Sequence, residues 1–130
     1  MPQFDKHFTI EEARGWLPEL RRKFAEIHTL YSELGEMQAE FEKVQAIVRM
    51  NGHAPKATGF EDRALKLKQL VQEITEAGIE IKDIGRGLID FPHIREDGEE
   101  VFLCWELCED ELNFWHRIED GFPGRQPLED

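Results

Sequence analysis

The chain has 130 residues, of which 40% are hydrophobic and 34% are charged. This length supports one hydrophobic core and is short for two domains, so we expect a single domain over residues 1–130. Sixteen Lys and Arg residues stand against 28 Asp and Glu residues, which gives a formal net charge of -12. Because so acidic a surface repels phosphate backbones and anionic lipid headgroups, we expect neither nucleic acid nor a membrane as a partner.

The sequence also lacks the apolar segments of membrane and exported proteins. Its uninterrupted apolar runs are no longer than five residues, far below the roughly 18 needed to cross a bilayer. Residues 1–7 do not contain the apolar stretch of a signal peptide. We therefore expect a cytoplasmic protein in which Cys104 and Cys108 are reduced thiols rather than a disulfide.

A long first helix is predicted from residue 10 onward. Thr9 and Glu12 have the spacing of a capping box, which places the start of the helix at Ile10. Pro18 cannot donate its backbone hydrogen bond, so we expect a kink or a restart there and a long helix from about Pro18 to Met50. The apolar stripe slips in phase near Gly35. It consists of Ile10, Ala13, Leu17, Leu20, Phe24, Ile27, Tyr31, Leu34, Met37, Phe41, Val44 and Val48.

A second, shorter helix is predicted from about Glu61 to Ala77, with Gly78 as its C-terminal cap. Residues 51–59 show no periodicity and are interpreted as the connector of a helical hairpin over residues 10–77. From their lengths, the second helix can cover only the C-terminal half of the first, and the sheet must cover the N-terminal half. A helix this long projects from a domain of 130 residues, and such a projection favours contact with a partner.

Short strands are predicted beyond Gly78. Residues 79–82 alternate in hydropathy, residues 88–91 lead into Pro92, and Asp97-Gly98 is typical of a hairpin turn before a strand at 101–107. We therefore expect the α+β class: a long antiparallel helical hairpin, followed by a small antiparallel sheet and a C-terminal tail over residues 78–130. The sheet is expected to pack on the N-terminal half of the first helix.

Residues 112–118 fit two structures. They alternate as a strand, which we favour, but Asp110 can also cap a short helix there. If Glu109 and Asp110 form a two-residue turn, Cys104 faces Trp115 and Leu103 faces His116. The core face of the sheet then holds Leu103, Trp105, Phe114 and His116, and the outer face holds Cys104, Glu106, Asn113, Trp115 and Arg117.

Four segments carry a resemblance to a known family. They are FTIEEARGWLPELRR, IKDIGRGLIDFP, VFLCWELCEDELNFWH and GFPGRQPL, and the most distinctive matches are Asp90-Phe91-Pro92, Cys104-Trp105, Trp115-His116 and Gly124-Arg125. With these segments the chain resembles the bacterial domain of unknown function 2203 family over nearly its whole length. The resemblance implies a bacterial source and a shared fold, and it brings no catalytic residues. Cys108 stands where the family favours glycine.

The cysteines and histidines do not predict a metal site or a nucleophile pair. Residues four apart on a strand lie about 13 Å apart, so Cys104 and Cys108 cannot bind one zinc ion together with Glu106 and His116. The expected register also places Cys104 and His116 on opposite faces of the sheet, which excludes a Cys–His pair. We therefore expect no metal and no cofactor.

Two arginines beside glycines suggest an anion site. Arg86 lies between Gly85 and Gly87, and Arg125 follows Gly124, so backbone amides and a guanidinium can converge on a carboxylate or a phosphate. Pairing of both arginines with nearby carboxylates is the alternative that we favour, since neither loop leads into a helix. The candidate ligand-binding residues are Arg86, Glu106, Trp115, His116 and Arg125.

Two functions follow from these patterns. The first, which we favour, is a non-enzymatic oligomeric interaction or scaffold module that uses its helical hairpin to form a homo-oligomer. The second is a protein that binds a small molecule, such as an anion, or an enzyme, with its site on the C-terminal sheet. The sequence does not decide whether the protein is an enzyme.

Overall fold

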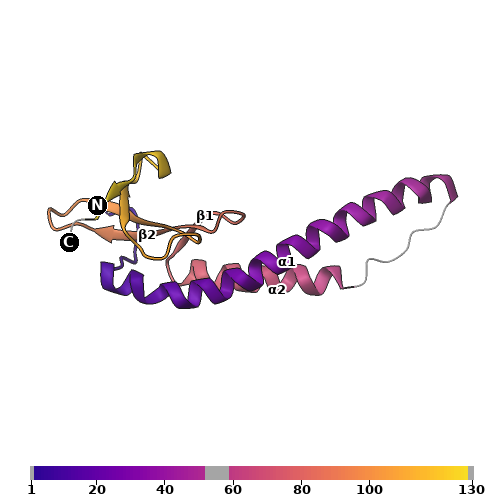
Figure 1. Ribbon diagram of the computed structural model, residues 1–130, viewed down its shortest axis with the longest axis horizontal. Coiled ribbons are helices and arrows are strands. Elements are labelled where there is room, and N and C mark those ends of the chain that lie inside the picture. The colour runs from indigo at the N-terminus through magenta and orange to yellow at the C-terminus, as the bar shows by residue number, and fades with distance from the viewer. Residues whose placement is uncertain (1, 52–58, 129–130) are drawn as a thin grey trace.

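The computed structural model describes residues 2–51 and 59–128, with the side chains of residues 44, 45 and 47–51 left out. Two helices, α1 (Ile10–Asn51) and α2 (Phe60–Glu76), precede an antiparallel sheet with the strand order β1-β2-β3-β4-β5 (Figure 1). The α+β class with an antiparallel sheet is confirmed. The predicted connector falls largely on residues outside this description. The strands are β1 (Glu80–Asp83), β2 (Leu88–Ile94), β3 (Glu100–Glu106), β4 (Phe114–Arg117) and β5 (Gln126–Pro127).

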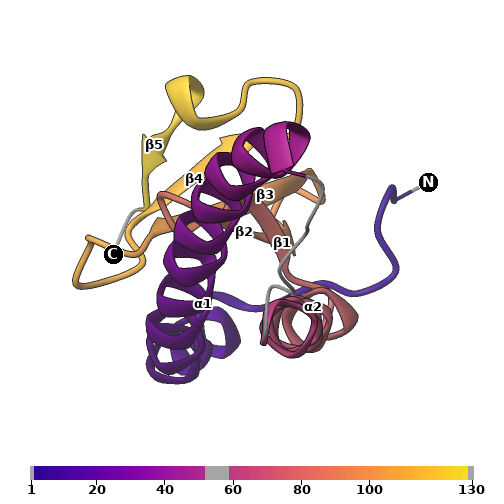
Figure 2. The same ribbon diagram turned by 90° about the vertical axis from the view of Figure 1, so that its right-hand side faces the viewer.

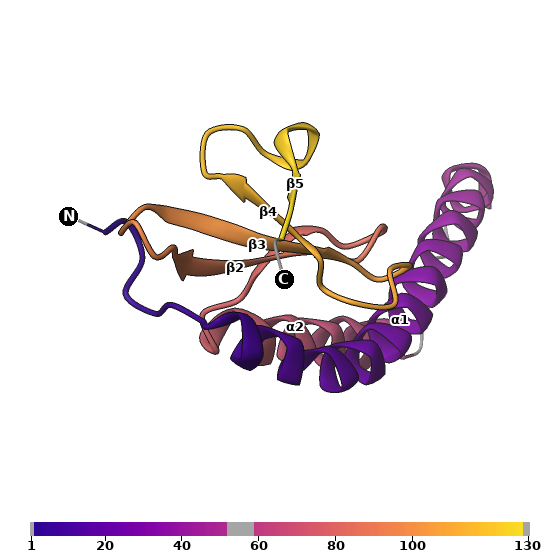
Figure 3. The same ribbon diagram turned by 60° about the vertical axis from the view of Figure 1, so that its left-hand side comes forward.

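Helix α1 begins as predicted but does not restart at Pro18. The Thr9 hydroxyl accepts from the Glu12 amide at 3.0 Å, and a Glu12 carboxylate oxygen accepts from the Thr9 amide at 2.9 Å. The helix then continues through Pro18 to Asn51. Its side chains before and after the proline, including Leu17 and Leu20, are buried in the same core. The predicted restart is therefore wrong, because burial on both sides of Pro18 keeps a single, bowed helix (Figure 3).

Helix α2 runs antiparallel to the middle of α1. Lys23 pairs with Glu73 at 3.0 Å, and Glu33 pairs with Arg63 at 3.5 Å. The residue numbers of the partners therefore rise along α1 while they fall along α2, as in an antiparallel pair. The expectation that the shorter helix covers the C-terminal half of the longer one is thus wrong. Gly78 follows α2 with a φ of 91°, and its amide donates to the Thr75 carbonyl, as a C-terminal cap does.

No helix within the described ranges has both the length and the apolar character that crossing a bilayer requires.

The sheet lies between two layers. Figures 2 and 3 show α1 and α2 on one side of it, and a short 3-10 helix, η1 (Phe122–Gly124), on the other. Alternate residues of β2, β3 and β4 point to the helices and pack with them in one core. The core residues of the three strands are Ile89, Phe91, Val101, Leu103, Trp105 and Trp115, and those of the helices are Ala13, Leu17, Leu20, Phe24, Ile27, Leu30, Leu70 and Ile74.

Residues 114–117 form a strand, as favoured, but in a register one residue away from the expected one. Leu103 pairs with Trp115, and Phe102 pairs with His116. Trp115 therefore lies on the core face and His116 on the outer face, the reverse of the prediction. Phe114, expected in the core, shares the outer face with Cys104, and Arg117, expected outside, pairs with Val101 of the core face.

The register differs because the β3–β4 connection is not a two-residue turn. Seven residues, 107–113, separate the two strands. Leu112 is fully buried, and the Glu109 carbonyl accepts from the Trp105 indole at 3.0 Å. Arg14 of α1 also donates to the Leu112 carbonyl. These contacts draw the loop toward the core and shift the pairing of β4 by one residue.

Trp105 is the largest fully buried side chain, so its truncation tests the core. We expect Trp105→Ala to lower the free energy of unfolding by about 3 to 5 kcal/mol, because it leaves a cavity and removes the indole hydrogen bond to the Glu109 carbonyl. Lys66→Ala on the exposed side of α2 is the control and should change stability by less than about 0.5 kcal/mol. Urea unfolding followed by circular dichroism measures both, and an unchanged midpoint for Trp105→Ala would contradict the assignment.

Candidate functional site

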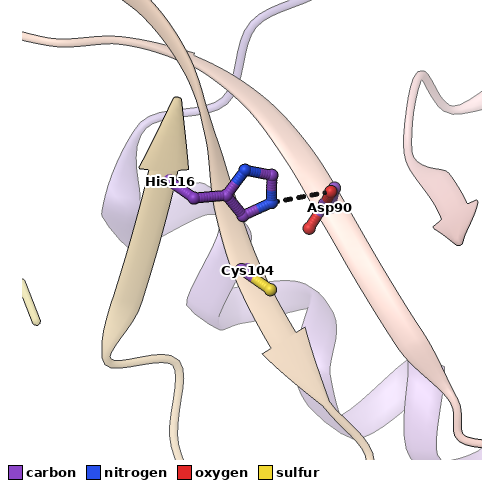
Figure 4. Close-up of side chains that lie close together, drawn as sticks. All are labelled: Asp90, Cys104 and His116. Carbon is purple, nitrogen blue, oxygen red and sulfur yellow. Dashed lines mark hydrogen bonds and ion pairs between the residues drawn. The ribbon is translucent and has the colours of Figure 1, made fainter. Parts of the chain in front are cut away.

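The outer face of the sheet, turned away from α1 and α2, carries three polar side chains on three adjacent strands. Asp90 of β2 lies directly opposite Cys104 of β3, and Phe102 of β3 lies opposite His116 of β4. Cross-strand partners and residues two apart share a face, so Asp90, Cys104 and His116 all project to this side. Figure 4 shows them together, and one donor atom from each lies within 4.8 Å of the others.

The centre of this group is a buried pair between Asp90 and His116. Each residue is 2% exposed, and Nε2 of His116 lies 3.0 Å from Oδ2 of Asp90 (Figure 4). The other ring nitrogen, Nδ1, donates to the Arg117 carbonyl at 2.7 Å. Burial lowers the pKa of His116, but the hydrogen bonds to Asp90 and Arg117 outweigh it and raise that pKa above its ordinary value. Both partners, a carboxylate and a carbonyl, are acceptors, and this arrangement favours the ring form with a proton on each nitrogen.

Cys104 is the third member of the group and is held as a neutral thiol. It is 1% exposed, and burial, followed by the nearby Asp90 carboxylate, raises its pKa far above the ordinary value for a thiol. The sequence analysis placed Cys104 and His116 on opposite faces, and that expectation is wrong because of the register shift in β4. Sharing a face does not make them a nucleophile and its base, because both His116 nitrogens already have other partners.

A cavity of about 220 Å³ lies beside this group. Lys82 stands at its wall, where Nζ pairs with Glu80 at 2.6 Å and lies 4.7 Å from the Phe102 ring centroid. The cavity is thus mainly apolar, with one ammonium and the Asp90–His116 pair as its polar groups. Its lining is Lys82, Leu88, Asp90, Phe102, Cys104, His116, Ile118, Gly121 and Phe122.

Asp90 carries an unsatisfied acceptor next to this cavity. Its second carboxylate oxygen, Oδ1, is buried and has no hydrogen-bond partner among the described residues. A buried carboxylate oxygen normally accepts at least one hydrogen bond, and leaving it unsatisfied is costly. The oxygen lies on the carboxylate that borders both the thiol and the cavity, so a group placed there gains a strong interaction.

Arg86 and Arg125 each have a carboxylate partner. Nε and Nη2 of Arg86 donate to the Glu106 carboxylate at 2.9 and 3.3 Å. Nη2 of Arg125 donates to both Glu109 oxygens at 2.7 and 2.8 Å. The two guanidinium carbons nevertheless lie 4.5 and 4.7 Å from the centroid of Phe122. Both guanidinium groups therefore lie against the Phe122 ring that lines the cavity, and the anion cradle itself stays a prediction.

The five residues predicted for a ligand site do not form one cluster. His116 lines the cavity, Arg86 and Arg125 contact its Phe122 wall, and Glu106 pairs with Arg86. Trp115 lies on the opposite face of the sheet, beside a different cavity that His93 and Arg95 also line. Neighbouring residues on a strand point to opposite faces, so Trp115 and His116 lie on either side of the sheet, and the register decides which of them faces outward.

Sequence reasoning missed Asp90, Lys82 and Phe122. A signal for Asp90 exists: it is a carboxylate inside the apolar run Leu88-Ile89-Asp90-Phe91, where a strand is buried on both faces. A charge in such a position needs a partner, so a buried cation on a neighbouring strand was deducible. The sequence of residues 121–128 is interpreted as a loop with two hydrophobic anchors, but it does not indicate that the Phe122 ring packs over the outer face of the sheet.

The comparisons with known proteins bear on the family of the chain alone. Searches of curated proteins and of solved structures found no match to the chain. One family model, described as an uncharacterized conserved protein family, DUF2203, matches residues 6–128. Three of the motifs that carry the resemblance in the sequence supply Asp90, Cys104 and His116, which the fold brings to one place. The chain therefore belongs to the DUF2203 family.

Proposed function

We propose that the protein binds a small ligand in the cavity beside Asp90, Cys104 and His116. One observation carries this proposal: the buried Oδ1 of Asp90 lacks a hydrogen-bond partner among the described residues and belongs to a side chain that lines the cavity. A ligand that satisfies this oxygen offsets the cost of leaving it bare. The sequence analysis ranked a site on this sheet second, and the geometry of the outer face now supports it more directly than any contact of the helices.

The cavity restricts the chemistry of the ligand. Its volume of about 220 Å³ lies below the range of about 300 to 1,000 Å³ typical of drug-sized ligands, so the ligand is small. Because Asp90 presents an acceptor, the ligand carries a hydrogen-bond donor or a positive charge at that end. Leu88, Phe102 and Phe122 surround the remainder with apolar surface.

The proposal is one of binding rather than of covalent catalysis by the thiol. Cys104 is held protonated, and the His116 nitrogens are engaged with Asp90 and Arg117, so no base lies ready to activate the thiol. A small anion held by Arg86 and Arg125, as expected from the sequence, is a proposal separate from the cavity ligand, and a cytoplasmic location is proposed as well. Inorganic phosphate is the probe for the anion, and Arg86→Lys should weaken its binding if the guanidinium fork takes part.

Binding of small fragments, with and without a substitution that fills the cavity, tests the ligand site. We expect amine- and amide-containing fragments of about ten heavy atoms to shift the NMR signals of residues that line the cavity, with Lys82 and Gly121 as reporters. Ile118→Trp places an indole at the cavity wall and should abolish these shifts, because the fragments lose their space.

Ile94→Trp is the matched control. Ile94 is 38% exposed at the end of β2 and does not line the cavity, so its replacement should leave the fragment shifts unchanged. Fragment shifts that persist in Ile118→Trp, or a complete lack of shifts in the wild-type chain, would contradict a ligand site here.

The long antiparallel helical hairpin supports a second candidate, a homo-oligomeric interaction module. Helix α1 has 42 residues, a length of about 63 Å, and its C-terminal end extends beyond α2 (Figure 1). Tyr31 is 54% exposed, Leu65 is 57% exposed, and the ion pairs place both at the same level of the helix pair. Phe41 is 36% exposed farther along α1, and the side chains of Val44 and Val48 lie outside the described residues.

The oligomeric state in solution tests this candidate. We expect light scattering at micromolar concentration to give at least twice the chain mass of 15.3 kDa, because a second copy can cover the exposed apolar side chains. The double variant Tyr31→Glu/Phe41→Glu should lower the mass to that of a monomer, whereas Ile94→Glu on the sheet should not. A wild-type chain that is monomeric at all concentrations would remove the helical interface.

A further inference from the structure

We propose that Asp90, Cys104 and His116 form a zinc-binding site whose fourth coordination position faces the cavity. This inference rests on the proposed function, since it names a metal ion as the positively charged group that meets Asp90. The sequence analysis considered Cys104 as a zinc ligand only in combination with Cys108, Glu106 and His116. The fold supplies a different set of donors, one from each of three adjacent strands.

The donor atoms are of the right kind and close to the right spacing. A carboxylate oxygen, a thiol sulfur and an imidazole nitrogen are three ligands that zinc accepts together, and calcium or magnesium would select oxygen alone. Ligands around a tetrahedral zinc lie about 3.3 to 3.8 Å apart, given bonds of about 2.0 to 2.3 Å. The three donors here lie within 4.8 Å of one another, so side-chain movements of about 1 Å or less close the site.

The surroundings of the donors match those of a metal site. His116 donates Nδ1–H to the Arg117 carbonyl at 2.7 Å, which orients the ring and leaves Nε2 directed at Asp90 and the proposed metal position. Histidines that bind metals typically have such a partner on the other nitrogen. The bare Oδ1 of Asp90 is the second sign, because it is a buried acceptor that no described residue satisfies.

Zinc leaves no net charge in the buried site. A tetrahedral zinc takes Cys104 as a thiolate and His116 through an unprotonated Nε2, so any proton on Sγ or Nε2 leaves to solvent when the ion binds. Zn²⁺ with carboxylate Asp90, thiolate Cys104 and neutral His116 sums to zero, which keeps the cost of burying the ion low.

Three protein ligands leave one tetrahedral position open. Among the described residues no fourth His, Cys, Asp or Glu joins the group, and the adjoining space is the cavity of about 220 Å³. Zinc sites with three protein ligands hold water or a small ligand at the fourth position. Water or a small molecule with a lone-pair donor can take this fourth position, with the apolar wall at Phe122 beside it.

Titration of the tag-free, chelator-treated chain with Zn²⁺ by calorimetry tests the site. We expect one Zn²⁺ per chain in the wild type and in Cys108→Ser, which removes only the exposed thiol. Cys104→Ser, close to the same shape, should weaken binding at least tenfold, because change of even an outer-shell partner typically costs 10- to 100-fold. With Co²⁺ as the probe, a thiolate-to-cobalt absorption band should form in Cys108→Ser and not in Cys104→Ser.

A structural measurement keeps the test independent of how well the variants fold. Anomalous scattering at the zinc edge from crystals of the wild-type chain should place the ion between Asp90, Cys104 and His116. Equal zinc affinity in Cys104→Ser and Cys108→Ser, or zinc located elsewhere, would overturn the proposal. If fragments shift the NMR signals of the cavity but no zinc binds, only the metal site is overturned. If neither fragment-induced shifts nor zinc binding is observed, the ligand site is overturned as well.

Discussion

The buried pair between Asp90 and His116 is the interaction on which the outer half of the molecule depends. It joins β2 to β4 across β3 at 3.0 Å, with both side chains almost fully buried. Two charges in such a place are costly to bury, and removal of either one leaves the other without a partner. The pair therefore constrains which residues of β4 can face outward. It also sets the position of Cys104, which lies between the two strands that the pair connects.

The helices bury the opposite face of the sheet by ordinary hydrophobic packing. One core joins α1, α2 and the strands, and it needs no polar contact at its centre. The polar contacts of α1 lie at the margin of this core, where Arg14, Arg21 and His28 donate to, or pair with, loop carbonyls of the sheet half. One face of the sheet thus packs against the helices in the hydrophobic core, and the other face holds Asp90, Cys104 and His116.

Local patterns were sufficient to predict most elements. The Thr9–Glu12 capping box, the cap at Gly78 and the hairpin at Asp97-Gly98 depend on neighbouring residues only, and each is found as expected. The strand phase of Trp105 was also correct. The site was not predictable in the same way, because it depends on how β4 aligns with β3. That alignment comes from the burial of Leu112 and the contacts of Glu109, which are tertiary contacts with α1, Trp105 and Arg125. A shift of one residue was enough to exchange Trp115 and His116 and to hide the group from sequence reasoning.

The protonation state of His116 in the chelator-treated protein tests the central claim most directly. Its pKa is raised above the unfolded value of about 6.5, so the pair contributes stability fully below that pH and loses it as the pH rises through the folded pKa. Nitrogen-15 NMR of the imidazole should show both ring nitrogens protonated at pH 6, and this signal should persist above pH 6.5. A neutral ring at pH 6, or a titration midpoint below about 6.5, would contradict a buried Asp90–His116 ion pair.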